Sequence, residues 1–308
     1  MVLNKKIAKK DNCSFGFFDD GICFVRVSQH KGEPPCVEDL EFCEGELNSH
    51  PLLLKHLAKS RNLKKTHCNT YIHNQFYQLL LTDKPSVPDE DLTNALHWEI
   101  KDLLINPIDD VTLDTFSAPD YGIGKKHINI VAANKAKISE IAKQFEEAKL
   151  DLNAIDIEEF AIRNLVILDK YEKLGVVTLW LSSEHGKILF FSDDNLHLIR
   201  NIDIGFNAIT NNLNGMENIA LEVQRSIDYF ERHYNQIPIS NLLLMPIGLE
   251  SSGFEKFLKQ NLSLSCHKYE IEKHIKGLDN IDAAKLSKFL LTIGLGLRQE
   301  QRKADAVR

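Results

Sequence analysis

Two β-hairpin patterns, one near the start of the chain and one just past its middle, constrain the fold most. Residues 14–27 contain two runs of aromatic and β-branched residues around an Asp-Asp-Gly triplet, and an Asp-Gly pair in that setting predicts a tight hairpin. After Gly175, short β-rich runs predict an antiparallel meander over residues 176–181, 187–191 and 197–204. Each half of the chain is therefore expected to open with antiparallel strands, as a weak internal repeat.

Helical periodicity follows each of these hairpins. It is clearest in residues 217–234, where apolar residues recur at steps of four, four, three and four from Ile219 to Tyr234. Further helices are expected after Pro51 and over residues 91–104, 137–149, 158–170, 253–260 and 282–299. Further strands are expected over residues 71–81, 111–117, 126–132, 154–157 and 241–245. Strands and helices that alternate in both halves predict an α/β fold or mixed α+β layers, with a domain boundary at 170–175.

Composition and charge place the chain among ordinary globular proteins. It has 308 residues, 43% of them hydrophobic and 26% charged, which suits two domains. The net charge of −7 argues against binding of duplex nucleic acid, because such proteins usually carry a basic patch. Six cysteines without a CxxC pair favour a reducing cytosol. No apolar segment follows the lysine-rich start, and the apolar stretch 286–297 is too short to span a bilayer, so a cytoplasmic protein is expected.

Common catalytic and metal-binding motifs are missing from the sequence. It contains no HExxH, GxSxG, P-loop or GxGxxG pattern. His67, Cys68 and His73 could form a metal site, but polar loop and strand positions are the simpler interpretation. The sequence therefore predicts no catalytic residue and no metal site.

Five stretches occur in an order that is typical of one family. The helix ALHWEIKDLL precedes a proline and a strand with Asp114, and HINIVAANKAKISEIAKQF precedes a short strand with Asp156. LIRNIDIG ends in a turn at Gly205, IALEVQRSIDYF carries Glu222 and Arg225, and LLTIGLGLR lies near the end. Over residues 90–302 this order resembles the PilM family of type IV pilus assembly proteins, within the actin-like ATPases. The closest branch is MshI of the mannose-sensitive haemagglutinin (MSHA) pilus.

The resemblance implies an α/β, actin-like (ribonuclease H-like) fold with two lobes around a central cleft. Residues 1–172 would form the first lobe, with an inserted α/β subdomain. Residues 173–308 would form the second lobe, whose C-terminal helix could return to the first. In such proteins two tight β-hairpins donate backbone N–H groups to the phosphates of ATP, and aspartates hold Mg²⁺, usually through water.

The motifs that would bind the nucleotide are altered in this chain. Phe18 and Trp180 stand where the family has the aspartates of its two hairpins, and Ser182 replaces a glycine. The residues left to contact ATP are Asp19, Asp20, Gly205, Glu222, Arg225 and Gly248. Glu222 and Arg225 could equally form an ordinary i, i+3 ion pair on a helix. We therefore expect a pseudo-ATPase that hydrolyses ATP weakly or not at all, with residual binding of ATP and Mg²⁺ left open.

The resemblance also implies a partner and a location. The family binds the cytoplasmic tail of a PilN-like inner-membrane protein in a groove on its first lobe. Residues 37–124 are expected to build that lobe, and the sequence identifies no groove residue. The expected role is a cytoplasmic scaffold of an MSHA-like pilus at the inner face of the bacterial inner membrane, with contact to a motor ATPase through other platform proteins. One alternative is an active actin-like ATPase that uses Asp19, Asp20, Glu222 and Arg225. Another is the cytoplasmic component of a type II secretion platform, which would continue into a membrane span that this chain lacks.

Overall fold

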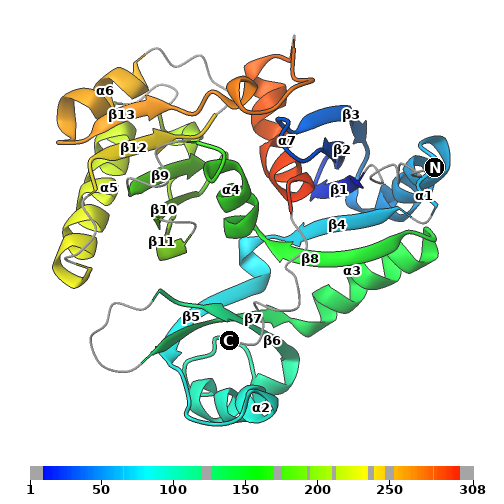
Figure 1. The fold of residues 1–308 in the computed structure, drawn as a ribbon, viewed down its shortest axis with the longest axis horizontal. Coiled ribbons are helices and arrows are strands. Elements are labelled where there is room, and N and C mark those ends of the chain that lie inside the picture. Colours follow the sequence, from blue (N-terminus) through cyan, green and yellow to red (C-terminus); the bar gives the residue numbers. More distant parts are fainter. Residues whose placement is uncertain are drawn as a thin grey trace, which may run out of the picture.

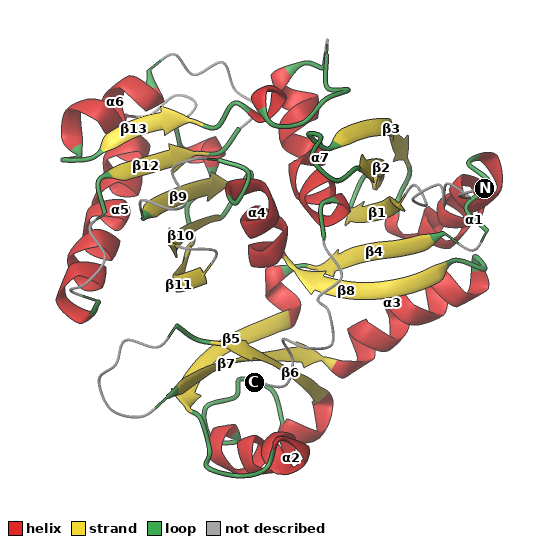
Figure 2. Ribbon diagram, in the orientation of Figure 1, coloured by secondary structure: helices red, strands yellow, loops and turns green. Residues whose placement is uncertain are grey.

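The structure contains two five-stranded sheets and one three-stranded sheet, with helices packed on each (Figure 1, Figure 2). It is a computed structural model that describes residues 10–64, 66–119, 126–169, 175–192, 195–209, 213–234, 239–246, 253–279 and 281–298. Among the helices in these ranges, none combines the length and the apolar character needed to cross a membrane.

The first sheet has the strand order β3-β2-β1-β4-β8. Its strands are β1 (Lys10–Phe18), β2 (Gly21–Gln29), β3 (Cys36–Glu44), β4 (His67–Ile72) and β8 (Asp151–Ile157). The first three are antiparallel, and Phe18 pairs with Gly21 across a two-residue turn, so the expected hairpin is confirmed. β4 and β8 extend the sheet in parallel. β3 is absent from the sequence-based expectation, which takes its acidic residues for a loop.

Helices cover both faces of this sheet. On one face α1 (His50–Ser60) and α3 (Lys135–Glu147) bury Leu54 and Phe145 against Phe15 and Phe24. On the other face lie α4 (Glu158–Val166) and the C-terminal α7 (Ala283–Gly296), which contacts β1, β2 and α4. A Cβ added to Gly294 would come within 2.1 Å of the Ala161 carbonyl oxygen, so only glycine allows α7 and α4 to approach this closely.

The three-stranded sheet forms a separate unit at the lower end of Figure 1. Its order is β5-β7-β6, from β5 (Tyr77–Asp83), β6 (Val111–Ser117) and β7 (His127–Asn134), and α2 (Asp89–Ile100) packs on one face. The prediction of one strand over residues 71–81 is wrong. The chain leaves the first sheet at Ile72, turns through a short 3₁₀ segment (Asn74–Phe76), and enters the three-stranded sheet at Tyr77.

The second five-stranded sheet repeats the topology of the first, in the order β11-β10-β9-β12-β13. Its elements are β9 (Val176–Leu181), β10 (Gly186–Ser192), β11 (Asn195–Ile202), β12 (Asn241–Leu244), β13 (Ser265–Lys268), α5 (Leu213–His233) and α6 (Phe254–Asn261). β9 to β11 form the predicted antiparallel meander, and β12 and β13 add in parallel. The internal repeat is therefore real at the level of topology, although β13 was too short to be expected from the sequence.

One apolar cluster joins the two large sheets. It contains Val25 and Tyr71 of the first sheet, Trp180 and Phe191 of the second, and Phe289 of α7. A backbone link adds to it, because Val37 N donates to the Lys276 carbonyl at 2.8 Å and Lys276 N donates to the Pro35 carbonyl at 2.9 Å. The two lobes are thus held together by a shared core and by a short stretch of β-pairing.

Candidate functional site

The turn of the first hairpin presents its two aspartates to solvent. Asp19 and Asp20 form the turn between β1 and β2, and both are exposed. Lys288 Nζ, from α7, donates to the Asp20 carboxylate at 2.7 Å. Phe18, where the family resemblance places an aspartate, has its ring 6.2 Å from the imidazole of His73. The first hairpin therefore directs an aromatic ring, and not a carboxylate, toward the neighbouring strand β4.

The turn of the second hairpin is closed by its own polar groups. Ser182 N donates to the His185 carbonyl at 2.8 Å, and His185 N donates to Ser182 Oγ at 3.2 Å. Gly205 lies directly behind this turn, because an added Cβ would come within 2.3 Å of the Ser183 carbonyl oxygen. Phe206 N then donates to the Ser182 carbonyl at 2.8 Å. The turn is held from two sides, and residue 205 has to be glycine for the close approach.

The remaining predicted residues lie elsewhere. On α5, Arg225 Nη1 donates to Glu222 Oε1 at 2.7 Å, and Arg200 Nη2 of β11 donates to Glu222 Oε2 at 3.4 Å. The i, i+3 ion pair considered for Glu222 and Arg225 therefore forms. Gly248 lies outside the described residues. A contact between any of these residues and nucleotide stays a prediction.

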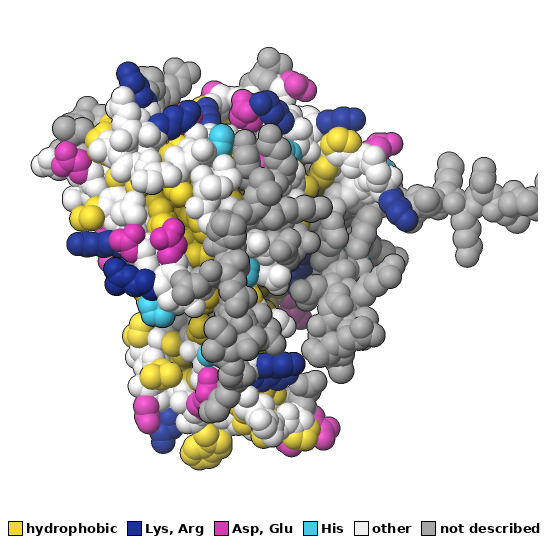
Figure 3. Space-filling view, turned by 60° about the vertical axis from the view of Figure 1, so that its left-hand side comes forward, with side chains coloured by type: hydrophobic (Ala, Val, Ile, Leu, Met, Phe, Trp, Pro, Cys, Tyr) yellow, Lys and Arg dark blue, Asp and Glu magenta, His cyan; other side chains and the backbone are white. Residues whose placement is uncertain are grey.

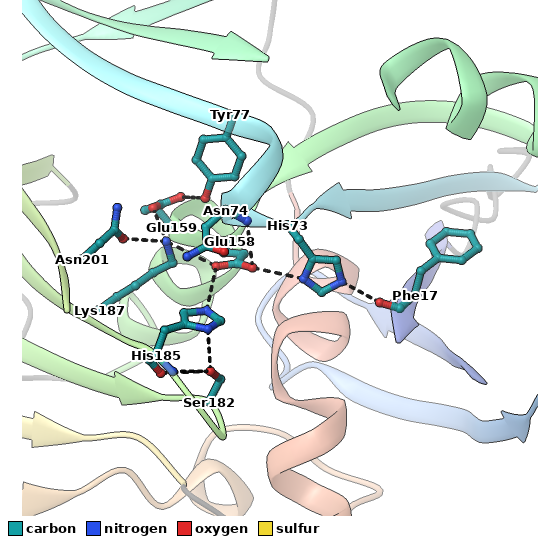
Figure 4. Close-up of polar contacts among 10 residues, drawn as sticks. All are labelled: Phe17, His73, Asn74, Tyr77, Glu158, Glu159, Ser182, His185, Lys187 and Asn201. Atoms are coloured by element: carbon teal, nitrogen blue, oxygen red, sulfur yellow. Dashed lines mark hydrogen bonds and ion pairs between the residues drawn. The ribbon is translucent and has the colours of Figure 1, made fainter. Parts of the chain in front are cut away.

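A buried cluster of charges, which sequence reasoning did not single out, lies between the two hairpins (Figure 4). Its centre is Lys187, the second residue of β10, whose side chain is fully buried. The ammonium Nζ lies 2.7 Å from Glu159 Oε1, 3.2 Å from Glu158 Oε2 and 2.9 Å from Asn201 Oδ1. Both carboxylates are equally buried, with 1% and 0% of their side chains exposed. We call His73, Glu158, Glu159, His185 and Lys187 the charge cluster.

His73 connects the charge cluster to the first hairpin. Its Nε2 lies 2.6 Å from the Phe17 carbonyl oxygen, and its Nδ1 lies 3.3 Å from Glu158 Oε1. A carbonyl oxygen and a carboxylate both accept hydrogen bonds, so this arrangement favours the protonated form of His73, in which both ring nitrogens donate. Burial lowers the pKa of His73, but the hydrogen bonds to Glu158 and to the Phe17 carbonyl outweigh it and raise the pKa above its usual value.

The charges of the cluster balance. Burial raises the pKa of Glu158, but His73 and Lys187 outweigh it and hold that pKa below its usual value. Burial lowers the pKa of His185, which keeps this imidazole neutral near pH 7. When His73 is protonated, two carboxylates face one ammonium and one imidazolium. A buried set of ions is tolerated in a folded protein only when it is paired in this way.

The fold brings these residues together from all three sheets. β8 runs directly into α4, so Glu158 and Glu159 occupy the first turn of a helix, where the helix dipole favours negative charge. His73 follows β4, and Tyr77 at the start of β5 donates its hydroxyl to Glu159 Oε2 at 2.5 Å. Lys187 comes from the second large sheet. The charge cluster is therefore the point at which the two lobes and the three-stranded unit meet.

The two aromatic substitutions noted in the sequence lie in the apolar cluster between the lobes. Trp180 is a buried member, with 7% of its surface exposed, and Phe18 packs against the same cluster. The ring of Trp180 lies 5.6 Å from that of His185, next to the charge cluster. Where the family resemblance places two metal-binding aspartates, this chain has apolar side chains that belong to its core.

Comparison with solved structures identifies the fold. A chain of the PilM-PilN type IV pilus biogenesis complex superimposes with a TM-score of 0.73 and 16% sequence identity, covering 94% of this chain and 99% of that one. The cytoplasmic domain of EpsL, an inner-membrane component of the Vibrio cholerae type II secretion system, gives 0.51 at 10% identity, covering 94% and 96%. A Bacteroides thetaiotaomicron protein with an actin-like ATPase fold gives 0.52 at 10% identity, covering 95% and 99%.

Comparison of sequences does not identify a family for this chain. No protein-family model and no curated protein sequence matches the chain. At 16% identity and below, the structural likenesses establish the architecture. The chain therefore has the α/β, actin-like fold that its sequence predicts.

Proposed function

We propose that this protein is a scaffold of a type IV-type pilus platform, of the MSHA-like kind, and that its nucleotide site is degenerate. The position of Lys187 is the main observation in favour of a degenerate nucleotide site. Its ammonium lies between two buried carboxylates, in the region between the hairpins where the family resemblance places phosphate and Mg²⁺. A fixed side-chain cation there takes over the charge neutralisation that a bound metal would otherwise provide.

Three further features support a poor fit for Mg-ATP. Phe18 and Trp180 replace carboxylates with apolar rings that pack in the core. The Ser182 and His185 N–H groups of the second hairpin already donate within their own turn, which leaves them unavailable to a phosphate. Glu158 and Glu159 would repel phosphate if Lys187 moved away. ATP and Mg²⁺ are therefore expected to bind weakly if at all, and we derive no catalytic step through them.

The proposed partner is the cytoplasmic tail of a PilN-like inner-membrane protein, which would place the scaffold at the inner face of that membrane. Support comes from the likeness to the PilM-PilN complex over 94% of this chain. Within the described residues, β5 and β6 form the two edges of the three-stranded sheet, in the region expected to build the lobe that carries the groove. An edge strand can pair with an extended peptide through its main chain, while pockets beside it select side chains.

Calorimetric titration with Mg-ATP, combined with a thermal-shift assay, tests the degenerate site. We expect no heat and no stabilisation at millimolar nucleotide, either with Mg²⁺ or with EDTA in its place. Micromolar binding that requires Mg²⁺ would contradict the proposal. It would favour the alternative of an active actin-like ATPase, and loss of hydrolysis in Asp20→Ala would then support that alternative.

A separate titration tests the partner. The probe is a synthetic peptide of the cytoplasmic tail of a PilN protein, and the control is a scrambled peptide of the same composition. Saturable binding of the tail alone supports the pilus scaffold. Equal heats for the two peptides would remove that support.

A second candidate is the cytoplasmic component of a type II secretion platform. The likeness to the EpsL cytoplasmic domain favours it, although the TM-score of 0.51 is lower than the 0.73 found for the pilus complex. Specific co-purification with type II secretion platform proteins, together with no binding of the PilN tail, would decide for this candidate.

A further inference from the structure

The negative charge of the protein is concentrated in one part of the chain. Residues 83–114, which comprise α2 and its flanking segments, contain nine carboxylates and two lysines, a net charge of −7 that equals that of the whole chain. The other residues are therefore neutral in sum. The excess negative potential of the molecule is thus located at the lower end of Figure 1.

Three large apolar side chains of this region are more than half exposed. Trp98 is 78% exposed, Leu103 55% and Ile105 83%. The opposite side of α2 is the one that packs, because Leu96 and Ile100 are buried against the three-stranded sheet. Trp98 lies two residues from each of them, a rotation of about 200° around the helix, and so points outward. Figure 3 shows apolar side chains at the lower end of the molecule with acidic side chains among them.

The fold holds the backbone that carries Leu103 and Ile105 in place. The side chain of Gln78 in β5 forms two hydrogen bonds with the segment that follows α2. Its Nε2 donates to the Leu103 carbonyl at 2.9 Å, and its Oε1 accepts from Ile105 N at 3.0 Å. Thr82 Oγ1 donates to Glu99 Oε1 at 2.9 Å, which fixes a carboxylate one residue beyond Trp98. A surface ordered before binding loses little conformational entropy when a partner docks.

We propose that Trp98, Leu103 and Ile105, with the carboxylates of Glu99 and Asp102, form a docking face for a basic amphipathic segment of a partner protein. Charge complementarity selects this occupant. Nucleic acid and anionic membrane would be repelled by a net charge of −7 in this segment. A second copy of the chain would bring two negatively charged faces together, and they would repel each other. A helix with leucines on one side and lysines on the other would cover the apolar residues and pair with the carboxylates.

This inference does not rest on the proposed function. The face consists of Trp98 on the outer side of α2 and of Leu103 and Ile105 just beyond that helix. It would bind a partner through side chains, whereas the proposed tail would pair with the main chain of a strand edge. Failure of ATP or PilN-tail binding therefore leaves the docking face untouched, and the reverse also holds.

Quenching of Trp98 fluorescence by acrylamide gives a direct test on the full chain. The other tryptophan, Trp180, is only 7% exposed, so the neutral quencher reports mainly on Trp98. The probe is a peptide of about 18 residues, five helical turns, with leucines on one face and lysines on the other. Saturable protection of Trp98 at low ionic strength, weakened by added salt, is expected.

Variants and control peptides decide the outcome. Ile105→Ser combined with Asp102→Lys should weaken binding roughly tenfold or more, whereas Leu221→Ser on α5, which is 47% exposed, should leave it unchanged. Equal protection by a scrambled peptide of the same composition would overturn the proposal, because charge alone would then explain it. Protection that rises with protein concentration without peptide, and is lost in Ile105→Ser, would overturn it in favour of a second copy.

Discussion

Replacing Lys187 with methionine removes one charge from the charge cluster while keeping an unbranched side chain of similar length. The ammonium is fully buried and lies 2.7 Å from one carboxylate and 3.2 Å from another. At an effective dielectric constant of about 20, Coulomb's law gives about 6 and about 5 kcal/mol of attraction for these two pairs. Part of this attraction offsets the cost of burying the ions. Loss of one partner from a buried ion pair therefore lowers the free energy of unfolding by about 3–5 kcal/mol.

Urea unfolding followed by tryptophan fluorescence measures this loss. Trp180, which lies 5.6 Å from His185, reports on the region, and Trp98→Phe removes the exposed second tryptophan. The matched control is Lys55→Met. It breaks a 3.2 Å ion pair with Glu147 whose side chains are 44% and 45% exposed, and it should cost about 0–1 kcal/mol.

A second variant separates charge from packing. Lys187→Met combined with Glu158→Gln and Glu159→Gln removes the uncompensated carboxylates and should recover most of the lost stability. The reasoning would be refuted if Lys187→Met cost no more than Lys55→Met, or if the triple variant were as unstable as the single one.

Three other residues give further expected outcomes. Folding raises the pKa of His73 above its usual value of 6.5, so protonated His73 stabilises the protein fully below pH 6.5. This contribution is lost as the pH rises from 6.5 through the pKa of the folded state. Over that pH range the urea midpoint of the wild type should therefore fall more than that of His73→Gln. Gly205→Ala should lower the free energy of unfolding by about 1–3 kcal/mol, since its Cβ would overlap the Ser183 carbonyl; an unchanged midpoint would refute this. Asp20→Asn breaks only an exposed pair with Lys288, so its free energy of unfolding should stay within about 0.5 kcal/mol of the wild-type value.

Periodicity and turn chemistry predict most of the secondary structure. Strands β6 and β9 have the predicted bounds, and the first hairpin turns at its Asp-Asp pair. The errors come from elements whose environment the sequence does not reveal. β3 carries acidic residues that its neighbours neutralise, as Arg61 does for Asp39 and Glu41, so its composition resembles that of a loop. The break at His73 was missed because only residues 73–76 separate the apolar end of β4 (Tyr71 and Ile72) from β5, although the two strands belong to different sheets.

The charge cluster was less accessible to sequence reasoning. Its members come from residues 73, 158, 159, 185 and 187, and only the fold brings them together. One signal was present, since Lys187 stands directly before the apolar residues ILFF in an interior strand of the second sheet. A lysine at such a position needs a buried acid as its partner. Which acid it meets depends on the packing of the second sheet against α4, which no local pattern encodes.

The position of α7 affects the order in which the protein can mature during synthesis. Every strand of the first sheet has been made once Ile157 leaves the ribosome, but the face that α7 covers still lacks its partner. The Asn12 side chain donates to the Gly296 carbonyl, 284 residues later in the chain. The first lobe to be translated is therefore the last to be completed. Until translation reaches that point, its exposed apolar face is a binding surface for chaperones and a risk for aggregation of the nascent chain.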